Sequence, residues 1–201
     1  MTPDALLQLT RRFTLVLGSG SPRRVQLLRE AGVPFRQMVS QVTEQRRPAE
    51  DPYSFARRMA REKTRAVASG CAKGEIVLGG DTVVVFRGQI LGKPDNEHDA
   101  VRTLQLLSGK IHTVGTALAL ATRDRSLCSG VEKTRVFFNE VTQEQIADYV
   151  ASGEPLDKAG AYGIQGMGAF LVDRIEGNLD NVVGLPFTLL ESLAREVLRL
   201  I

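Results

Sequence analysis

The sequence predicts an α/β fold, because short apolar runs typical of strands alternate with segments typical of helices along its 201 residues. Residues 13–17 form an apolar run that leads directly into a Gly/Ser junction and a helical segment. Residues 75–79 form a second apolar run, after a long helical segment that begins at Asp51-Pro52. From the length of the chain we expect a single domain, or two closely packed lobes, over residues 1–201, with residues 1–12 as an N-terminal extension.

The first half of the chain contains clear helix boundaries. Pro22 suits a first helical turn, Gly32 a helix end, and Asp51 an N-cap. The expected elements are a strand over 13–17, a helix over 22–31, a strand over 33–39, a polar loop over 41–50, a helix over 51–69, a strand over 75–79, and a hairpin of 83–86 and 89–91.

The second half is marked by a capping pattern, Thr142 with Gln145, and by a glycine-rich stretch over 157–168. So many small residues predict a loop whose backbone is closely approached. The expected elements are a helix over 96–107, a hairpin of 111–122 and 131–138, a helix over 142–151, a strand over 169–175, a loop over 181–186, and a helix over 186–200.

The composition argues against two classes of partner. Lys and Arg number 26 against 23 Asp and Glu, so the net charge of +3 is too small to indicate a nucleic-acid-binding protein. Aromatic residues make up 5% and tryptophan is absent, which is unfavourable for a base-stacking surface. Because no stretch approaches the ~20 apolar residues of a membrane span, no membrane partner is expected either.

The two cysteines and residues 1–12 indicate the cellular compartment in which the protein is expected. Cys71 and Cys128 do not form a metal-binding pair, and both are most simply free thiols of a reducing compartment. Residues 1–12 lack the apolar core of a secretory signal. We therefore expect a cytoplasmic protein.

The junction after the first strand is a candidate anion site. Backbone N–H groups at a helix beginning favour an anion, and Ser19 and Ser21 add hydroxyl groups. Arg23 and Arg24 place two guanidinium groups beside them, which match phosphate oxygens. The alternative is an ordinary helix cap with solvated arginines.

The helix over 51–69 carries one lysine on its apolar side. Lys63 lies among the apolar positions, where an ammonium has to be paired, reach solvent or bind an anion. The arginines on the opposite side are interpreted as a solvated face, with binding to a nucleic-acid backbone as the alternative; they are Arg57, Arg58, Arg61 and Arg65.

Carboxylates and further cations complete the set of candidates. Asp81 follows two glycines at the end of the strand over 75–79, where a carboxylate can hold a divalent ion or orient water. Glu44, in the polar loop, is either an exposed side chain or a partner of such an ion. Lys93 lies on a Gly-Lys-Pro turn, and Lys158 lies in the glycine-rich stretch.

Taken together, these motifs resemble the Maf family of nucleotide pyrophosphatases, in family order from near residue 14 to the end. The matching blocks are Ser19-x-Ser21-Pro22-Arg23-Arg24, Glu44, Lys63, Gly80-Asp81-Thr82-Val83-Val84, Gly92-Lys93-Pro94, 158–166 and 181–186. The resemblance implies an α/β fold like that of inosine triphosphate pyrophosphatases, with a mixed twisted sheet, flanking helices and a cleft between two lobes. It also implies frequent dimerisation, so a homodimer is expected.

The resemblance further implies hydrolysis of a nucleoside triphosphate to the monophosphate and pyrophosphate with a divalent metal, Mg²⁺ or Mn²⁺. It assigns catalysis to Asp81, Lys63 and Lys93, with Asp81 as the base, and metal binding to Glu44 and Asp81. The residues that the resemblance assigns to substrate binding are Ser19, Ser21, Arg23, Arg24, Thr82, Lys158 and Gln165.

Arg23, Thr82 and Gln165 resemble the family branch that prefers dTTP and UTP, with 7-methyl-GTP as the alternative substrate. The chain departs from the family pattern at Gly18, where alanine is common, and at Asn178-Leu179, where Ser-Tyr is common. A nucleotide-responsive regulator of cell division or septation, with secondary catalysis, is the other function that the resemblance leaves open.

Overall fold

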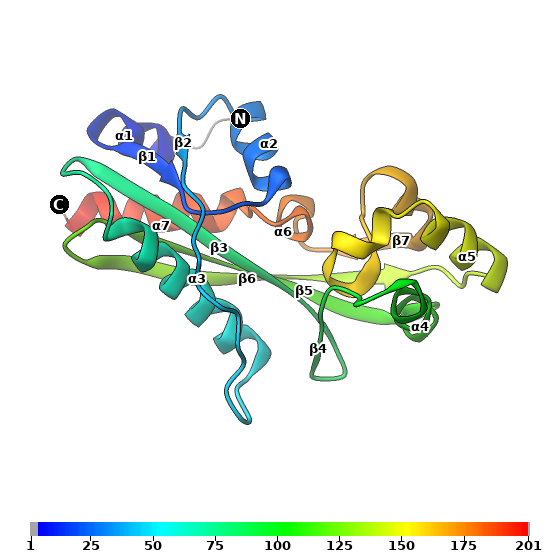
Figure 1. Cartoon of the computed structure of the whole chain (residues 1–201). Coiled ribbons are helices and arrows are strands. Elements are labelled where there is room, and N and C mark those ends of the chain that lie inside the picture. The colour runs from blue at the N-terminus through cyan, green and yellow to red at the C-terminus, as the bar shows by residue number, and fades with distance from the viewer. Residues whose placement is uncertain (1–3, 201) are drawn as a thin grey trace. The chain divides into compact units, whose positions relative to one another are not determined.

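The computed structural model describes residues 4–200 and confirms the α/β class (Figure 1). Within these residues, seven strands form one mixed sheet in the order β2-β1-β3-β5-β6-β7, with β4 beside β3. The strands are β1 (Thr14–Leu17), β2 (Arg36–Gln37), β3 (Glu75–Phe86), β4 (Gln89–Leu91), β5 (Ile111–Ala121), β6 (Ser126–Phe138) and β7 (Val172–Glu176).

The helices alternate with these strands along the chain. The α-helices are α1 (Asp4–Arg12), α2 (Pro22–Glu30), α3 (Pro52–Ala68), α4 (Glu97–Leu107), α5 (Gln143–Ala151), α6 (Leu179–Val183) and α7 (Phe187–Leu200). Three 3₁₀ turns are η1 (Glu154–Asp157), η2 (Ala159–Ala161) and η3 (Gly166–Leu171). None of the helices within residues 4–200 is both long and apolar enough to span a membrane.

The described residues divide into two compact units. Unit 1 comprises residues 4–81, 116–132 and 184–200, and unit 2 comprises residues 82–115 and 133–183. Strands β3, β5 and β6 contribute residues to both units. The division along β3 falls between Asp81 and Thr82, inside one of the motifs that the sequence identifies.

Unit 1 is built on parallel pairing of β1 with β2 and β3. The register of β1 on β3 runs from Thr14 opposite Glu75 to Leu17 opposite Leu78. Helix α1 packs against α7, and the Glu191 carboxylate of α7 accepts hydrogen bonds from the Ala5 and Leu6 N–H groups at 2.9 and 3.2 Å. The leucine-rich core of this unit lies wholly within it, so β1 and the first half of β3 form a rigid base for the residues that follow them.

Unit 2 has a separate core around the second half of β3. Here β3 pairs with β4 and β6 pairs with β7, both antiparallel. Helices α4 and α5 pack against each other (Figure 1). Asn96 caps α4, and Thr142 with Gln145 forms the expected capping box of α5. Buried His112 lies edge-on to Phe138 and Tyr162, and its Nε2 is 2.8 Å from the Tyr162 hydroxyl.

Five expected boundaries are wrong. Strand β6 begins at Ser126 and not at residue 131. Strand β3 runs without interruption through Asp81 instead of ending at Gly79, and β2 is limited to two residues. Strand β7 begins only at Val172, because the preceding residues form η3. The expected loop over 181–186 begins as helix α6. The buried Asn181 amide holds that helix by donating to the Val114 carbonyl at 3.1 Å and to Thr134 Oγ1 at 2.9 Å, contacts that a local sequence pattern does not reveal.

Candidate active site

The central feature of unit 1 is one ammonium group between two carboxylates. Lys63 Nζ donates to Asp81 Oδ1 and to Glu44 Oε1, each at 2.6 Å. The side chain of Asp81 is 7% exposed, that of Lys63 14% and that of Glu44 58%. Side chains alternate between the two faces of β3, and Asp81 lies on the face that meets the apolar side of α3, where Lys63 lies. A buried carboxylate and an ammonium group are therefore paired there, and the Glu44 carboxylate lies at the solvent side.

Burial is the strongest influence on Asp81 and raises the pKa of its carboxyl group. The Lys63 ammonium opposes this effect, the Glu44 carboxylate adds to it, and the Arg24 guanidinium opposes it more weakly. A carboxylate whose pKa is raised is a stronger base than a solvated one. The arrangement suits Asp81 to accept a proton from water while Lys63 holds the carboxylate in place.

The two glycines before Asp81 are required by the chain itself. A Cβ at Gly79 would lie 2.1 Å from Thr64 Oγ1 of α3, and a Cβ at Gly80 would lie 3.2 Å from Arg24 Nε and 3.1 Å from the Ala117 carbonyl. Protein groups therefore approach this backbone on both faces. The space that a Cβ at either position would enter is therefore filled by the chain and not by a ligand.

Arg24 is buried and links the junction after β1 to the C-terminal segment. Its Nε donates to the Gly184 carbonyl at 2.8 Å, and its Nη1 donates to Ser19 Oγ at 2.9 Å. Burial lowers the pKa of this guanidinium, and Asp81 is close enough to oppose that shift. Ser19 Oγ also accepts from the Ser21 N–H at 3.3 Å, whereas Arg23 lies partly exposed in the first turn of α2.

An ion pair that the sequence did not reveal anchors the loop that carries Glu44. Arg58 on α3 contacts the Glu50 carboxylate through Nε and Nη2, each at 2.7 Å, and donates to the Gln45 carbonyl at 2.9 Å. This contact lowers the pKa of Glu50 to about 2. Residues 38–50 run alongside α3 (Figure 1). The expected solvated face is therefore wrong for Arg58, which is only 17% exposed and holds the loop on the helix that carries Lys63.

Four other predicted site residues belong to unit 2. Thr82 is partly exposed on β3, and Lys93 is exposed on the turn after β4. Lys158 Nζ donates to the Glu154 carbonyl at 2.6 Å and to Asp157 Oδ1 at 2.7 Å. Gln165 is exposed in the glycine-rich loop. Their roles toward a substrate stay predictions.

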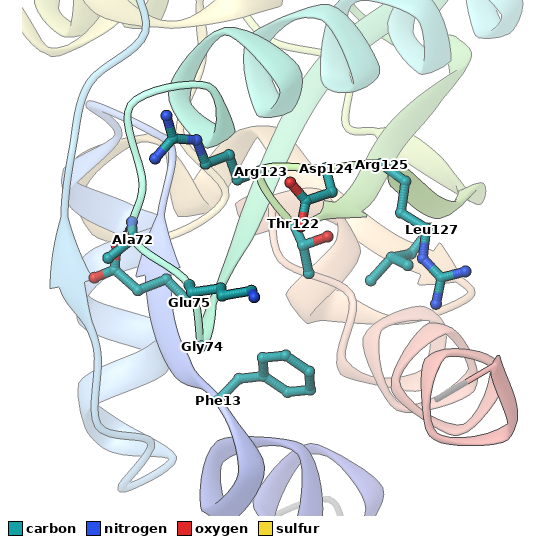
Figure 2. A pocket seen from close by; sticks show the side chains of 10 residues that line it. Phe13, Ala72, Gly74, Glu75, Thr122, Arg123, Asp124, Arg125 and Leu127 are labelled. Carbon is teal, nitrogen blue, oxygen red and sulfur yellow. Dashed lines mark hydrogen bonds between the residues drawn. The ribbon is translucent and has the colours of Figure 1, made fainter.

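A cavity of about 240 Å³ in unit 1 contains none of the predicted site residues (Figure 2). It lies at the beginning of β3, where Glu75 is six residues, or about 20 Å, from Asp81. The side chains of Arg123 and Arg125 diverge from each other (Figure 2), and Glu75 is already paired with Arg36 at 2.7 Å. Because its charged groups do not converge, we assign the chemistry to the Lys63–Asp81 cluster.

Comparison with known proteins places the chain in a family. A family model described as "Maf-like protein" matches residues 14–197. The chain belongs to the Maf-like family. This Maf-like chain is 49% identical to the "dTTP/UTP pyrophosphatase" of Escherichia coli O157:H7 over 173 residues, which cover 86% of this chain and 87% of that protein. It is 48% identical to the protein of the same name from Bacillus cereus (strain AH820) over 183 residues, which cover 91% of this chain and 93% of that protein.

Among solved structures, the Maf-like chain is similar to a HAM1 protein from Coxiella burnetii, with a TM-score of 0.44 and 14% identity. That alignment covers 92% of this chain and 99% of the other.

Proposed function

We propose that this chain hydrolyses dTTP and UTP to the nucleoside monophosphate and pyrophosphate. The observation that carries the proposal is the buried pair of Lys63 and Asp81, with 2.6 Å between Nζ and Oδ1. It occurs in a chain about half identical to two dTTP/UTP pyrophosphatases over most of its length. A buried, charge-paired carboxylate with a raised pKa is typical of a catalytic group.

In the proposed reaction, Asp81 accepts a proton from a water molecule whose oxygen attacks the α-phosphorus. The bond from the α-phosphorus to the oxygen that bridges to the β-phosphorus breaks, and pyrophosphate leaves. Lys63 keeps the carboxylate oriented and offsets negative charge that develops on the phosphates. Ser19, Ser21 and Arg23 bind phosphate oxygens at the junction before α2, where the helix N-terminus favours anions.

Arg24 supports that junction through Ser19 and adds positive potential near Asp81. The family resemblance assigns Lys93, Lys158 and Thr82 to the same substrate, and we retain those assignments as part of the proposal. Lys158 has to exchange its contact with Asp157 for a phosphate oxygen in that role.

The residues around Lys63 also fit a divalent cation. Within residues 4–200, no three His, Cys, Asp or Glu side chains form a complete metal site. Two carboxylates nevertheless converge on a single positive charge, and Mg²⁺ commonly takes one or two carboxylates together with substrate phosphates. We propose that Glu44 and Asp81 hold Mg²⁺ or Mn²⁺. When bound, the ion supplies charge neutralisation at the phosphates.

Base selectivity is proposed to depend on Gln165. Its amide offers one donor and one acceptor, which can pair with the N3–H and O4 groups shared by thymine and uracil. Cytosine has the reverse pattern at these positions, so an amide held in one orientation rejects it.

The test is a screen of purified protein against dTTP, UTP, CTP, GTP and 7-methyl-GTP, with pyrophosphate detection. We expect the highest kcat/KM for dTTP and UTP, and loss of that preference in Gln165→Ala. In ¹⁸O-water the label should enter the monophosphate. A preference for 7-methyl-GTP, or label in pyrophosphate, contradicts the proposal. Tight binding of a triphosphate without turnover favours the regulatory alternative.

We also propose that the protein acts as a homodimer, as the family resemblance implies, and that it does so in the cytoplasm, as its cysteine usage indicates. Light scattering coupled to size-exclusion chromatography tests the dimer, and a monomer at micromolar concentration contradicts it.

A further inference from the structure

Two side chains of unit 2 hold the backbone on both sides of Gln165. The Tyr149 hydroxyl, on α5, accepts a hydrogen bond from the Gly163 N–H at 3.0 Å and donates to Glu154 Oε1 at 2.9 Å. Glu154 Oε2 accepts from the Met167 N–H at 3.1 Å, and Oε1 accepts from the Gly168 N–H at 3.3 Å. The loop is thus fixed two residues before Gln165 and again two and three residues after it.

The same two side chains lie close to three glycines of this loop, Gly163, Gly166 and Gly168. A Cβ at Gly163 would lie 2.9 Å from Glu154 Oε1, and a Cβ at Gly168 would lie 2.5 Å from the Tyr149 hydroxyl oxygen. Gly166 has a φ of +77°, which disfavours any side chain. The groups that approach the backbone at these positions include Tyr149 and Glu154, together with the Gly163 carbonyl oxygen, which would lie 2.4 Å from a Cβ at Gly168, so this pattern is explained by contacts within the chain.

Gln165 itself projects from the loop without support. Its side chain is exposed, and within residues 4–200 its amide makes no hydrogen bond. The position of that amide therefore depends on the backbone on either side, which Tyr149 and Glu154 hold. Burial raises the pKa of the Tyr149 hydroxyl, which keeps it protonated as the donor to Glu154.

We propose that Tyr149 and Glu154 are positioning residues that set base selectivity by holding the loop around Gln165. This inference rests on the proposed function. With this clamp of Tyr149 and Glu154 in place, the backbone holds the Gln165 side chain at one position relative to the base, which restricts the geometries in which its amide can pair. Without the clamp, the loop samples other conformations and the amide reaches cytosine in further geometries, so discrimination falls more than turnover.

The decisive measurement is the ratio of kcat/KM for UTP to that for CTP. Tyr149→Phe keeps the ring, which packs edge-on to Phe170, and removes both hydrogen bonds of the hydroxyl. Glu154→Gln leaves one acceptor oxygen where the carboxylate has two. We expect either variant to lower the ratio by about tenfold or more, the effect of ~1.4 kcal/mol of lost discrimination, while kcat for UTP changes less.

Tyr162→Phe is the matched control. It removes a tyrosine hydroxyl from the same loop, but within residues 4–200 that hydroxyl is hydrogen-bonded to His112 and not to the Gly163, Met167 or Gly168 N–H groups. Its UTP/CTP ratio should equal that of the wild type. Hydrogen exchange of the Met167 and Gly168 amides should accelerate in Glu154→Gln and stay unchanged in the control.

An unchanged ratio in both clamp variants of an enzyme that prefers UTP overturns this inference alone. A wild type without preference for UTP overturns the proposed function and this inference together. If Glu154→Gln does not fold, Tyr149→Phe decides the question.

Discussion

Lys63 and Asp81 form a hydrogen-bonded ion pair, with 2.6 Å between Nζ and Oδ1, although they are 18 residues apart. Helix α3 supplies the cation and strand β3 the carboxylate, so the pair is fixed by the packing of these two elements. Breaking a largely buried pair leaves one charge without its partner, which is more costly than removing both.

Asp81→Asn should abolish most of the activity. The substitution keeps the shape of the side chain and removes the group that accepts the proton, so we expect kcat to fall by about a hundredfold or more. The measurement is pyrophosphate release from dTTP, with circular dichroism to confirm the fold. Turnover within threefold of the wild type removes Asp81 from the mechanism.

The pKa of Asp81 should move in opposite directions in two neighbouring variants. Lys63 lowers this pKa, so Lys63→Met should raise it; Glu44 raises it, so Glu44→Gln should lower it. The measurement is a ¹³C NMR titration of the carboxyl resonance in chelator-treated protein, with Asp81→Asn to assign the signal. Shifts of the same sign in both variants contradict the electrostatic arrangement described here.

Arg58→Lys should weaken metal binding without unfolding the protein. A lysine cannot reproduce the two contacts with Glu50 and the contact with the Gln45 carbonyl, so the loop carrying Glu44 loses its anchor. We expect the Mg²⁺ concentration for half-maximal rate to rise about tenfold, as is typical when support of a ligand is lost. Arg102→Lys is the control, because the Arg102 side chain is 76% exposed and pairs locally with Asp99 on α4. The same Mg²⁺ dependence in both variants argues against the anchor.

Gly79→Ala should destabilise unit 1. The added Cβ would lie 2.1 Å from Thr64 Oγ1 and 3.2 Å from the Ala60 carbonyl, so α3 and β3 have to separate. We expect the free energy of unfolding to fall by about 1–3 kcal/mol, measured by urea denaturation. Gly92→Ala is the control, because no atom lies within 4 Å of a Cβ added there. Equal stability of the two variants would disprove the close packing at Gly79.

His112 should make stability depend on pH. Burial lowers its pKa from 6.5 to about 4, so below pH 6.5 the unfolded chain binds a proton that the folded chain does not. As the pH falls from 6.5 to 4, this difference in proton binding at His112 should lower the free energy of unfolding by about 1.4 kcal/mol per pH unit. The total loss from His112 is about 3 kcal/mol. His112→Gln should lose this part of the slope, and exposed His98→Gln should keep it. The check is urea unfolding at several pH values. Equal slopes in the two variants contradict the prediction.

The sequence by itself determined the elements whose signals are local. The apolar run before Ser19 and the proline at position 22 predict β1 and α2, and Asp51-Pro52 predicts the beginning of α3. These signals are sufficient to predict the elements because a helix cap and an apolar period depend only on residues a few positions apart in the sequence. The position of Lys63 among apolar residues left its charge three possibilities, a partner, solvent or an anion, and the structure shows carboxylate partners.

Only the tertiary structure decided which groups meet. The partners of Lys63, the Arg58–Glu50 anchor, and the clamp on the glycine-rich loop join residues that no local period relates. The same holds for helix α6, which depends on hydrogen bonds from Asn181 to residues 47 and 67 positions away. The glycines of the stretch over 157–168 correctly predicted that other groups approach the backbone closely. Which groups approach it depends on packing between segments that are distant in the sequence, and sequence periodicity does not specify that packing.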